Sequence, residues 1–212
     1  MSKESISINH KHQNNSRFIS LIDDVKRRLS NDPLHYTDQS QDSVSLEKTL
    51  IVSIAEQKLY SLNKNDVEKS YLISTAEAGI GNFSGSFQTP LGIHRIIEKI
   101  GSNADLGSVF KGRKNTHQIA DILRDPNIRS ESDNITSRIL RLEGLEDGFN
   151  RGVDKDSNNV DSFSRYIYIH GTDEEGQLGK PVSHGCVRMA NQDIVELFES
   201  VEAGQLVLII KD

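Results

Sequence analysis

Two neighbouring stretches, RYIYIHGT (residues 165–172) and SHGCVR (residues 183–188), decide how the chain folds. Alternating isoleucine and tyrosine predict a β-strand over Arg165–Ile169, and this strand runs directly into His170. A short polar loop then brings the chain back to Cys186, its only cysteine. We therefore expect the histidine at the strand end and the cysteine to meet in space.

The chain on both sides of these stretches has the pattern of a mostly β protein. Helices are predicted from Asn191, as N-cap, through Val201 and, shorter, near Thr116–Leu123. The expected fold class is mostly β with a few helices, in a single domain. Its other strands are predicted at Thr49–Ala55, Lys58–Leu62, Ser70–Ala76, His94–Ile100, Thr136–Leu142 and Gln205–Ile210.

Residues 1–45 form a polar N-terminal segment, and the main domain is expected at residues 46–212. Apolar residues recur at helical spacing after Ser16 and predict one amphipathic helix, which should end at Asn31-Asp32-Pro33 and pack on the domain. Glu143–Ser164 is rich in Gly, Asp, Asn and Ser and indicates a long surface loop, which could act as a lid.

Composition excludes several classes of function. The chain has 212 residues and a formal net charge of −6, which creates no field that attracts nucleic acid or anionic lipid. Neither a membrane span nor the apolar run of a secretory signal is present, so we expect a cytoplasmic protein, or a periplasmic one if a native leader was removed. Oligomeric state is not predicted.

Cys186 is the candidate nucleophile because its setting is polar and glycine-rich. At neutral pH only about 3% of an ordinary thiol is ionised, so a cysteine nucleophile needs a base. His170 can take the proton and hold the thiolate as an ion pair, with the Gly171 carbonyl orienting its ring. The remaining histidines, His94 among them, are expected on the surface or in loops.

Two other interpretations of the same residues stay open. Cys186 could be an inert part of the core. His170, His184 and Cys186 could instead be three ligands of a catalytic zinc ion, although no HExxH or paired-cysteine motif supports this.

The His-Gly-Thr and Ser-His-Gly-Cys-Val-Arg motifs resemble the catalytic signature of the L,D-transpeptidase (YkuD-type) family. The similarity continues upstream in Thr89-Pro-Leu-Gly92 and downstream at Met189, Asn191 and Asp193, and it covers about residues 49–210. This resemblance implies a YkuD-like β-sandwich of mixed strands. It also implies an enzyme that acts on the peptide stems of bacterial peptidoglycan, without a metal or an organic cofactor.

The resemblance assigns catalytic roles to five residues. Cys186 would attack the carbonyl of the third stem residue, expel the terminal D-alanine and form a thioester. His170, oriented by Gly171, would act as base and then as acid. Backbone N–H groups around His184, Gly185 and Cys186 would form the oxyanion hole.

Three further residues are expected to bind substrate: Ser183, Thr172 and Arg188. For Arg188 two roles stay open, binding of a substrate carboxylate or bracing of the site. The expected partner is a tetrapeptide stem or a soluble muropeptide.

We hypothesise that water accepts the acyl group, which would make the protein an L,D-carboxypeptidase of muropeptide recycling. The alternatives are a true L,D-transpeptidase and, in another class, a non-catalytic peptidoglycan-binding module.

Overall fold

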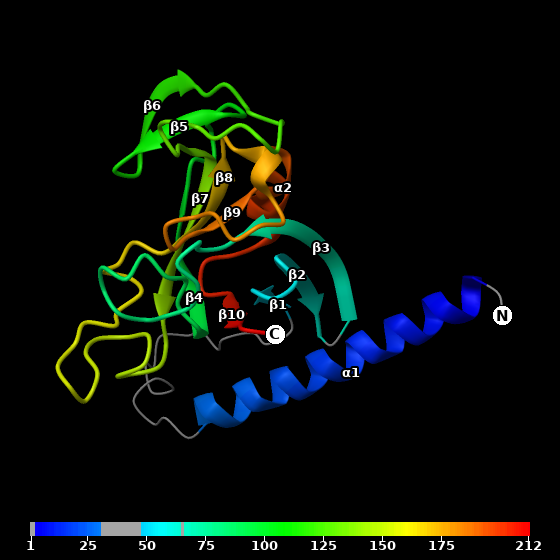
Figure 1. Cartoon of the computed structure of the whole chain (residues 1–212). Coiled ribbons are helices and arrows are strands. Elements are labelled where there is room, and N and C mark those ends of the chain that lie inside the picture. Colours follow the sequence, from blue (N-terminus) through cyan, green and yellow to red (C-terminus); the bar gives the residue numbers. More distant parts are fainter. Residues whose placement is uncertain (1–2, 31–47, 65) are drawn as a thin grey trace.

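The computed structural model describes residues 3–30, 48–64 and 66–212, with side chains of the first helix from Ser16 onward. Within these residues, no helix carries an apolar stretch that could cross a lipid bilayer. The elements, shown in Figure 1, are α1 Lys3–Ser30, β1 Lys48–Ser53, β2 Lys58–Asn63, β3 Asp66–Ser74, β4 Gly92–Ile100, β5 Ser108–Lys111, β6 Lys114–Ile119, β7 Ile135–Gly144, β8 Tyr168–Thr172, the 3-10 turn Glu175–Gln177, β9 Val187–Met189, α2 Asn191–Ser200 and β10 Leu206–Ile210.

All ten strands belong to one mixed sheet that folds back on itself. Their order is β4-β10-β1-β2-β3-β9-β8-β7-β5-β6, and β4 also pairs with β7. Eight strands therefore enclose one core, and the β5–β6 hairpin extends the sheet beyond β7. Two pairs, β1 with β10 and β8 with β9, are parallel, and the other pairs are antiparallel.

The core lies between the opposed halves of this sheet. Because side chains alternate along a strand, one set from each of these eight strands points inward. Helix α2 adds Ile194, Leu197 and Phe198 to this cluster. Leu50 of β1, Val207 of β10, Ile169 of β8 and Val187 of β9 belong to the same cluster.

The predicted fold class, mostly β with a few helices and strands of mixed direction, is confirmed. One local prediction is wrong, because the segment expected to form a helix near Thr116–Leu123 contributes strand β6. Gly112 and Arg113 have φ values of 54° and 66°, so the chain reverses in a two-residue turn and β6 pairs with β5.

The strand predicted over Arg165–Ile169 begins later, at Tyr168, and extends through the His-Gly-Thr motif. Tyr166 has a φ of 57°, which is incompatible with an extended strand, and its N–H binds the carbonyl of Phe163 in a turn.

Helix α1 covers the outer face of the sheet, as predicted, but it begins at Lys3 rather than at Ser16. Phe18, Val25 and Leu29 pack against the outward side chains of β1, β2, β4 and β10. Strands β1 and β10 are consequently buried on both faces, which explains their continuous apolar sequences. The expected stop at Asn31-Asp32-Pro33 lies outside the described residues.

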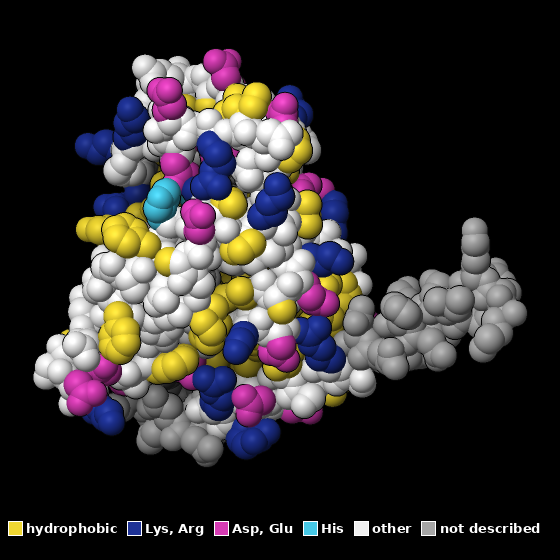
Figure 2. All heavy atoms as spheres, viewed as in Figure 1, with side chains coloured by type: hydrophobic (Ala, Val, Ile, Leu, Met, Phe, Trp, Pro, Cys, Tyr) yellow, Lys and Arg dark blue, Asp and Glu magenta, His cyan; other side chains and the backbone are white. Residues whose placement is uncertain are grey.

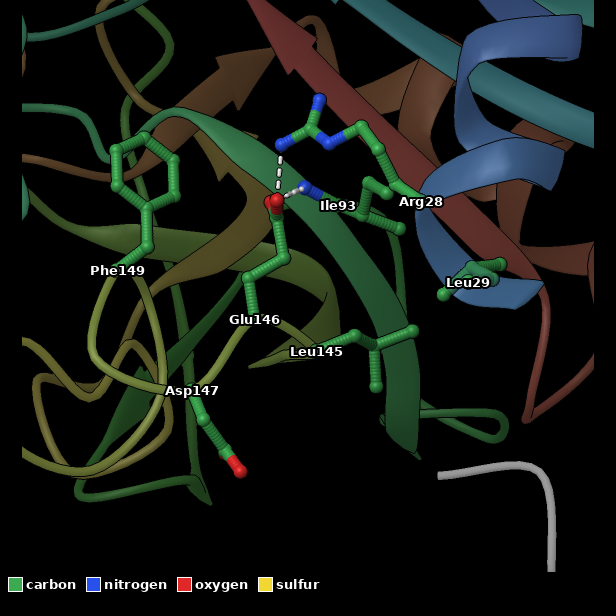
Figure 3. A pocket seen from close by; sticks show the side chains of 7 residues that line it. All are labelled: Arg28, Leu29, Ile93, Leu145, Glu146, Asp147 and Phe149. Carbon is green, nitrogen blue, oxygen red and sulfur yellow. Dashed lines mark hydrogen bonds and ion pairs between the residues drawn. The ribbon is translucent and has the colours of Figure 1, made fainter. Parts of the chain in front are cut away.

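The C-terminal end of α1 also meets the loop that follows β7 (Figure 3). Arg28 forms an ion pair with Glu146, whose other carboxylate oxygen accepts the N–H of Ile93 at 2.6 Å. These residues border a cleft of about 370 Å³ together with Leu145 and Phe149. The loop is therefore tied at its start to both α1 and β4.

His94 contradicts the expectation of a surface or loop position. It lies in β4 and is fully buried, with Nδ1 3.0 Å from the Gly92 carbonyl and Nε2 3.0 Å from the Ser162 hydroxyl. Since a carbonyl only accepts, Nδ1 carries the proton and Nε2 accepts from Ser162. Burial lowers the pKa of His94 to about 4.

Replacing Phe18 by alanine should destabilise the protein by about 3–5 kcal/mol, because the change leaves a cavity between α1 and the sheet. Phe18 is 1% exposed, whereas its neighbour Ile19 is 39% exposed. The free energy of unfolding, measured in urea, should change much less for Ile19→Ala. Equal effects of the two substitutions would contradict the docking of α1.

Candidate active site

The candidate site lies on the outer face of β7, β8 and β9. Strand alternation directs Ile169 and Val187 into the core, so His170 and Cys186 share the opposite face. The parallel register pairs Ile169 with Val187 and His170 with Arg188. His170 and Cys186 are therefore diagonal neighbours, separated by one strand spacing and two residues.

The ring of His170 is held in one orientation by its own backbone. His170 is 3% exposed, and its Nδ1 lies 2.8 Å from the Gly171 carbonyl. Because that oxygen only accepts, Nδ1 carries the proton and Nε2 keeps a lone pair. Burial lowers the pKa of His170 to about 4, so the imidazole is neutral at physiological pH.

Cys186 is also neutral in the free protein. Burial raises the pKa of its thiol to about 11, against the opposing charges of Arg188 and Arg165. The thiol donates to the Tyr166 carbonyl at 3.4 Å. The pKa shifts of both groups oppose the thiolate–imidazolium pair expected from the sequence, because burial disfavours the charged form of each.

Hydrogen bonds fix the turn that carries Cys186. The Ser183 hydroxyl donates to the Cys186 carbonyl at 2.6 Å and accepts the Gly185 N–H at 3.2 Å. Thr89 holds the Gly185 carbonyl at 3.0 Å. Gly185 has a φ of 132°, which other residues rarely adopt. Its N–H is occupied, so the predicted oxyanion role can fall only to the amides of His184 and Cys186.

Arg188 is a brace rather than a substrate contact. It is 2% exposed and bonds to Glu174 and Asp133, each at 2.6 Å. Asp133 also binds Nδ1 of the exposed His184 at 2.7 Å. Sequence reasoning missed both carboxylates, since no local motif marks them and they meet Arg188 only in the folded chain.

Thr172 and Ser183, expected from the sequence to bind substrate, are buried and hydrogen-bonded within the protein. Thr172 is fully buried, and its hydroxyl accepts the N–H of Glu174 at 3.1 Å, which positions this carboxylate beside Arg188. Ser183 is 2% exposed, and its hydroxyl serves the cysteine turn. Both hydroxyls are used inside the protein.

Asn191 joins the helix to the site, but not as the predicted N-cap, a position held by Ala190. Its side-chain oxygen accepts from Thr136 and Ser137 at 2.6 Å, and its amide donates to the Thr172 carbonyl at 2.8 Å. This clamp closes around Gly171, where a Cβ would lie 2.6 Å from the Thr136 carbonyl. Only glycine fits this position.

The two histidines of the motifs differ in exposure, because His170 is buried and His184 lies at the surface. His184 has the Phe87 ring edge-on at 6.3 Å and Asp133 on Nδ1. In the described part of the chain, no three His, Cys, Asp or Glu side chains gather as a metal site would require.

Comparison with known proteins gives a family match over most of the chain. The family model for the L,D-transpeptidase catalytic domain (YkuD) matches residues 47–209. YqjB of Bacillus subtilis, provisionally named an L,D-transpeptidase, is 48% identical over 48 residues, which are 23% of this chain and 27% of YqjB. "Probable L,D-transpeptidase YbiS" of Escherichia coli K12 is 48% identical over 48 residues, 23% of this chain and 16% of YbiS.

Among solved structures, an L,D-transpeptidase from Mycobacterium tuberculosis H37Rv aligns with a TM-score of 0.47 and 14% identity, over 78% of this chain and 58% of that one. The matched segments thus cover less than two thirds of these relatives.

The alkylation rate of Cys186 by iodoacetamide should rise about tenfold per pH unit from pH 7 to 10, because only the thiolate reacts and its pKa is about 11. Mass spectrometry can follow the reaction at this single cysteine. A rate that is already constant above pH 6 would instead demonstrate a stable ion pair with His170.

Gly171→Ala should destabilise the protein by roughly 1–3 kcal/mol, because the added methyl group overlaps the Thr136 carbonyl. Thermal unfolding measures the loss. The displaced Gly171 carbonyl should also change the NMR shifts of the His170 ring. An unchanged Tm together with unchanged shifts would show that the space around Gly171 accommodates a methyl group.

Proposed function

Since this chain belongs to the L,D-transpeptidase catalytic domain family, we propose that it removes the terminal D-alanine from peptidoglycan tetrapeptide stems through a thioester on Cys186, with water as the main acceptor. The observation that carries the proposal is the placement of His170 beside Cys186 on adjacent parallel strands, with Nδ1 held by the Gly171 carbonyl. This leaves the basic Nε2 to serve the thiol.

In the first half of the reaction, proton transfer accompanies attack because both groups start neutral. The thiol leaves the Tyr166 carbonyl, gives its proton to His170 Nε2, and Sγ attacks the carbonyl carbon of the third stem residue. The amides of His184 and Cys186 stabilise the oxyanion, a contribution typically worth a few kcal/mol. The imidazolium then protonates the leaving amine, the carbon–nitrogen bond of the tetrahedral intermediate breaks, and D-alanine departs to leave the thioester on Cys186.

In the second half, His170 acts as a base again. It takes a proton from water, and the resulting hydroxide attacks the thioester carbonyl. The carbon–sulfur bond breaks, and the departing sulfur recovers the proton from the imidazolium. The products are a tripeptide stem and the free enzyme.

The charges around the thiol support water as the acceptor. Arg165 and Arg188 act electrostatically on Cys186, and Arg113 and Arg141 act on the adjacent Tyr168. Arg188 is compensated by Asp133 and Glu174, and Arg141 by Glu98. Among the described residues, Arg165 and Arg113 have no carboxylate within ion-pair distance, so they would repel an acceptor amine in its ammonium form, whereas neutral water is not repelled.

Transpeptidation is the second candidate, favoured by the names of the matched relatives. It shares the thioester and differs only in the acceptor, an amine from another stem or a free D-amino acid.

Incubation with a disaccharide-tetrapeptide, with and without excess D-methionine, tests the proposal. We expect loss of one alanine and little exchange product by mass spectrometry, and no reaction of Cys186→Ala. Predominant exchange or dimer formation would establish transpeptidation. Equal behaviour of parent and Cys186→Ala would remove the enzyme assignment and leave a binding module.

A further inference from the structure

The proposed substrate ends in a carboxylate, and Arg188, the residue expected to bind it, is buried between Glu174 and Asp133. We propose that Arg113, at the tip of the β5–β6 hairpin, recognises the terminal carboxylate of the donor stem above the aromatic rings of Tyr166 and Tyr168. The inference rests on the proposed function and extends it to a residue that specifies the substrate.

The hairpin stands over the face that carries the site. Strand β5 pairs with β7 through Val109 and Phe110, and Phe110 packs in one cluster with Tyr168 and Cys186. Figure 1 shows β5 and β6 beyond β7 and β8, and Figure 2 shows both basic and acidic side chains on this upper part of the molecule. The hydrogen bond from Arg113 to Tyr168 connects the tip of the hairpin to the strand that carries His170.

The backbone of Arg113 is held in an unusual conformation by the hairpin turn. Its φ of 66° is favourable for glycine or asparagine but unfavourable for arginine, and it follows from the two-residue reversal between β5 and β6. Arginine at this position is therefore not explained by turn geometry, and its side-chain contacts must be considered.

Two contacts hold the guanidinium over the side chains of Tyr166 and Tyr168. Its Nη1 lies 3.3 Å from the Tyr168 hydroxyl, and its carbon lies 5.3 Å from the centre of the Tyr166 ring. The backbone carbonyl of Tyr166 accepts a hydrogen bond from the Cys186 thiol. The cation is thus held by the two residues that touch the thiol.

The electrostatic setting of Arg113 differs from that of the other arginines near the site. Among the described residues, no carboxylate lies within ion-pair distance of Arg113, and Glu98 acts on it only through longer-range electrostatics. Arg141, by contrast, pairs with Glu98, and Arg129 pairs with Glu174. Arg165 is occupied by the carbonyls of Gly81 and Gln88. Arg113 therefore retains donors for an incoming anion.

A second cation, Arg141, lies near the same tyrosine ring as Arg113, although it also pairs with Glu98. Arg141 is 9% exposed, stacks on Phe163 at 3.6 Å and lies 5.6 Å from the Tyr166 ring. Its Nε is buried without a hydrogen-bond partner among the described residues.

The substrate carries its carboxylate close to the reacting carbonyl. The terminal carboxylate lies one residue beyond the carbonyl that Cys186 attacks, a separation of about 3.5 Å. A guanidinium binds such a group through two parallel hydrogen bonds. An amide in its place offers no negative charge, so discrimination between acid and amide measures the contact.

The test compares a tetrapeptide that ends in D-alanine with the same peptide ending in D-alanine amide, using Arg113→Asn. Asparagine tolerates the positive φ, so the hairpin should keep its stability, which thermal unfolding checks. The parent should prefer the acid in kcat/KM, and the variant should lose roughly ten- to hundred-fold on the acid but little on the amide. Arg113→Lys should retain part of the preference.

Lys114→Gln is the matched control, because it removes a positive charge one residue away on the exposed hairpin and should keep the preference for the acid. An acid/amide ratio that is unchanged in Arg113→Asn, with normal turnover by the parent, overturns this inference alone. An inactive parent overturns the proposed function instead.

Discussion

The parallel pairing of β8 with β9 is the constraint on which the site depends. It sets His170 opposite Arg188 and directs Ile169 and Val187 into the core. A shift by one residue would turn the histidine or the cysteine inward and expose an apolar side chain. Core packing and catalytic geometry are therefore enforced by the same register. This makes the two strands, although short, the most restricted part of the sheet.

Burial of charged side chains beside this strand pair costs free energy, and their ion-pair partners offset that cost. Arg188 is removed from water with two carboxylates, and loss of either partner would leave an uncompensated charge. Thr172 positions Glu174, and Asp133 reaches from a distant segment to both Arg188 and His184. The Ser-His-Gly-Cys-Val-Arg segment is thus held in place by ion pairs with residues outside it, and not by its own sequence alone.

Burial also acts on the two groups that the proposed reaction uses. It raises the pKa of Cys186 and lowers that of His170, so both groups rest uncharged. Cys186 as a residue is nevertheless partly accessible, so it is not closed off from solvent. In the proposed reaction, charge would separate only when a substrate carbonyl is in place, and the arginines around the thiol would favour the developing negative charge.

The sequence by itself determined the mostly β fold, the docking helix and the pairing of His170 with Cys186, because periodicity and short motifs are local properties. It also predicted that the Gly171 carbonyl orients the histidine, since adjacent backbone is always within reach. Only the tertiary structure decided that Arg188, Thr172 and Ser183 are engaged in the interior, that Asp133 and Glu174 pair with Arg188, and that Arg113 contacts Tyr166 and Tyr168. Those contacts join segments far apart in the chain, and burial, which changes charge and access, is a property of the whole fold.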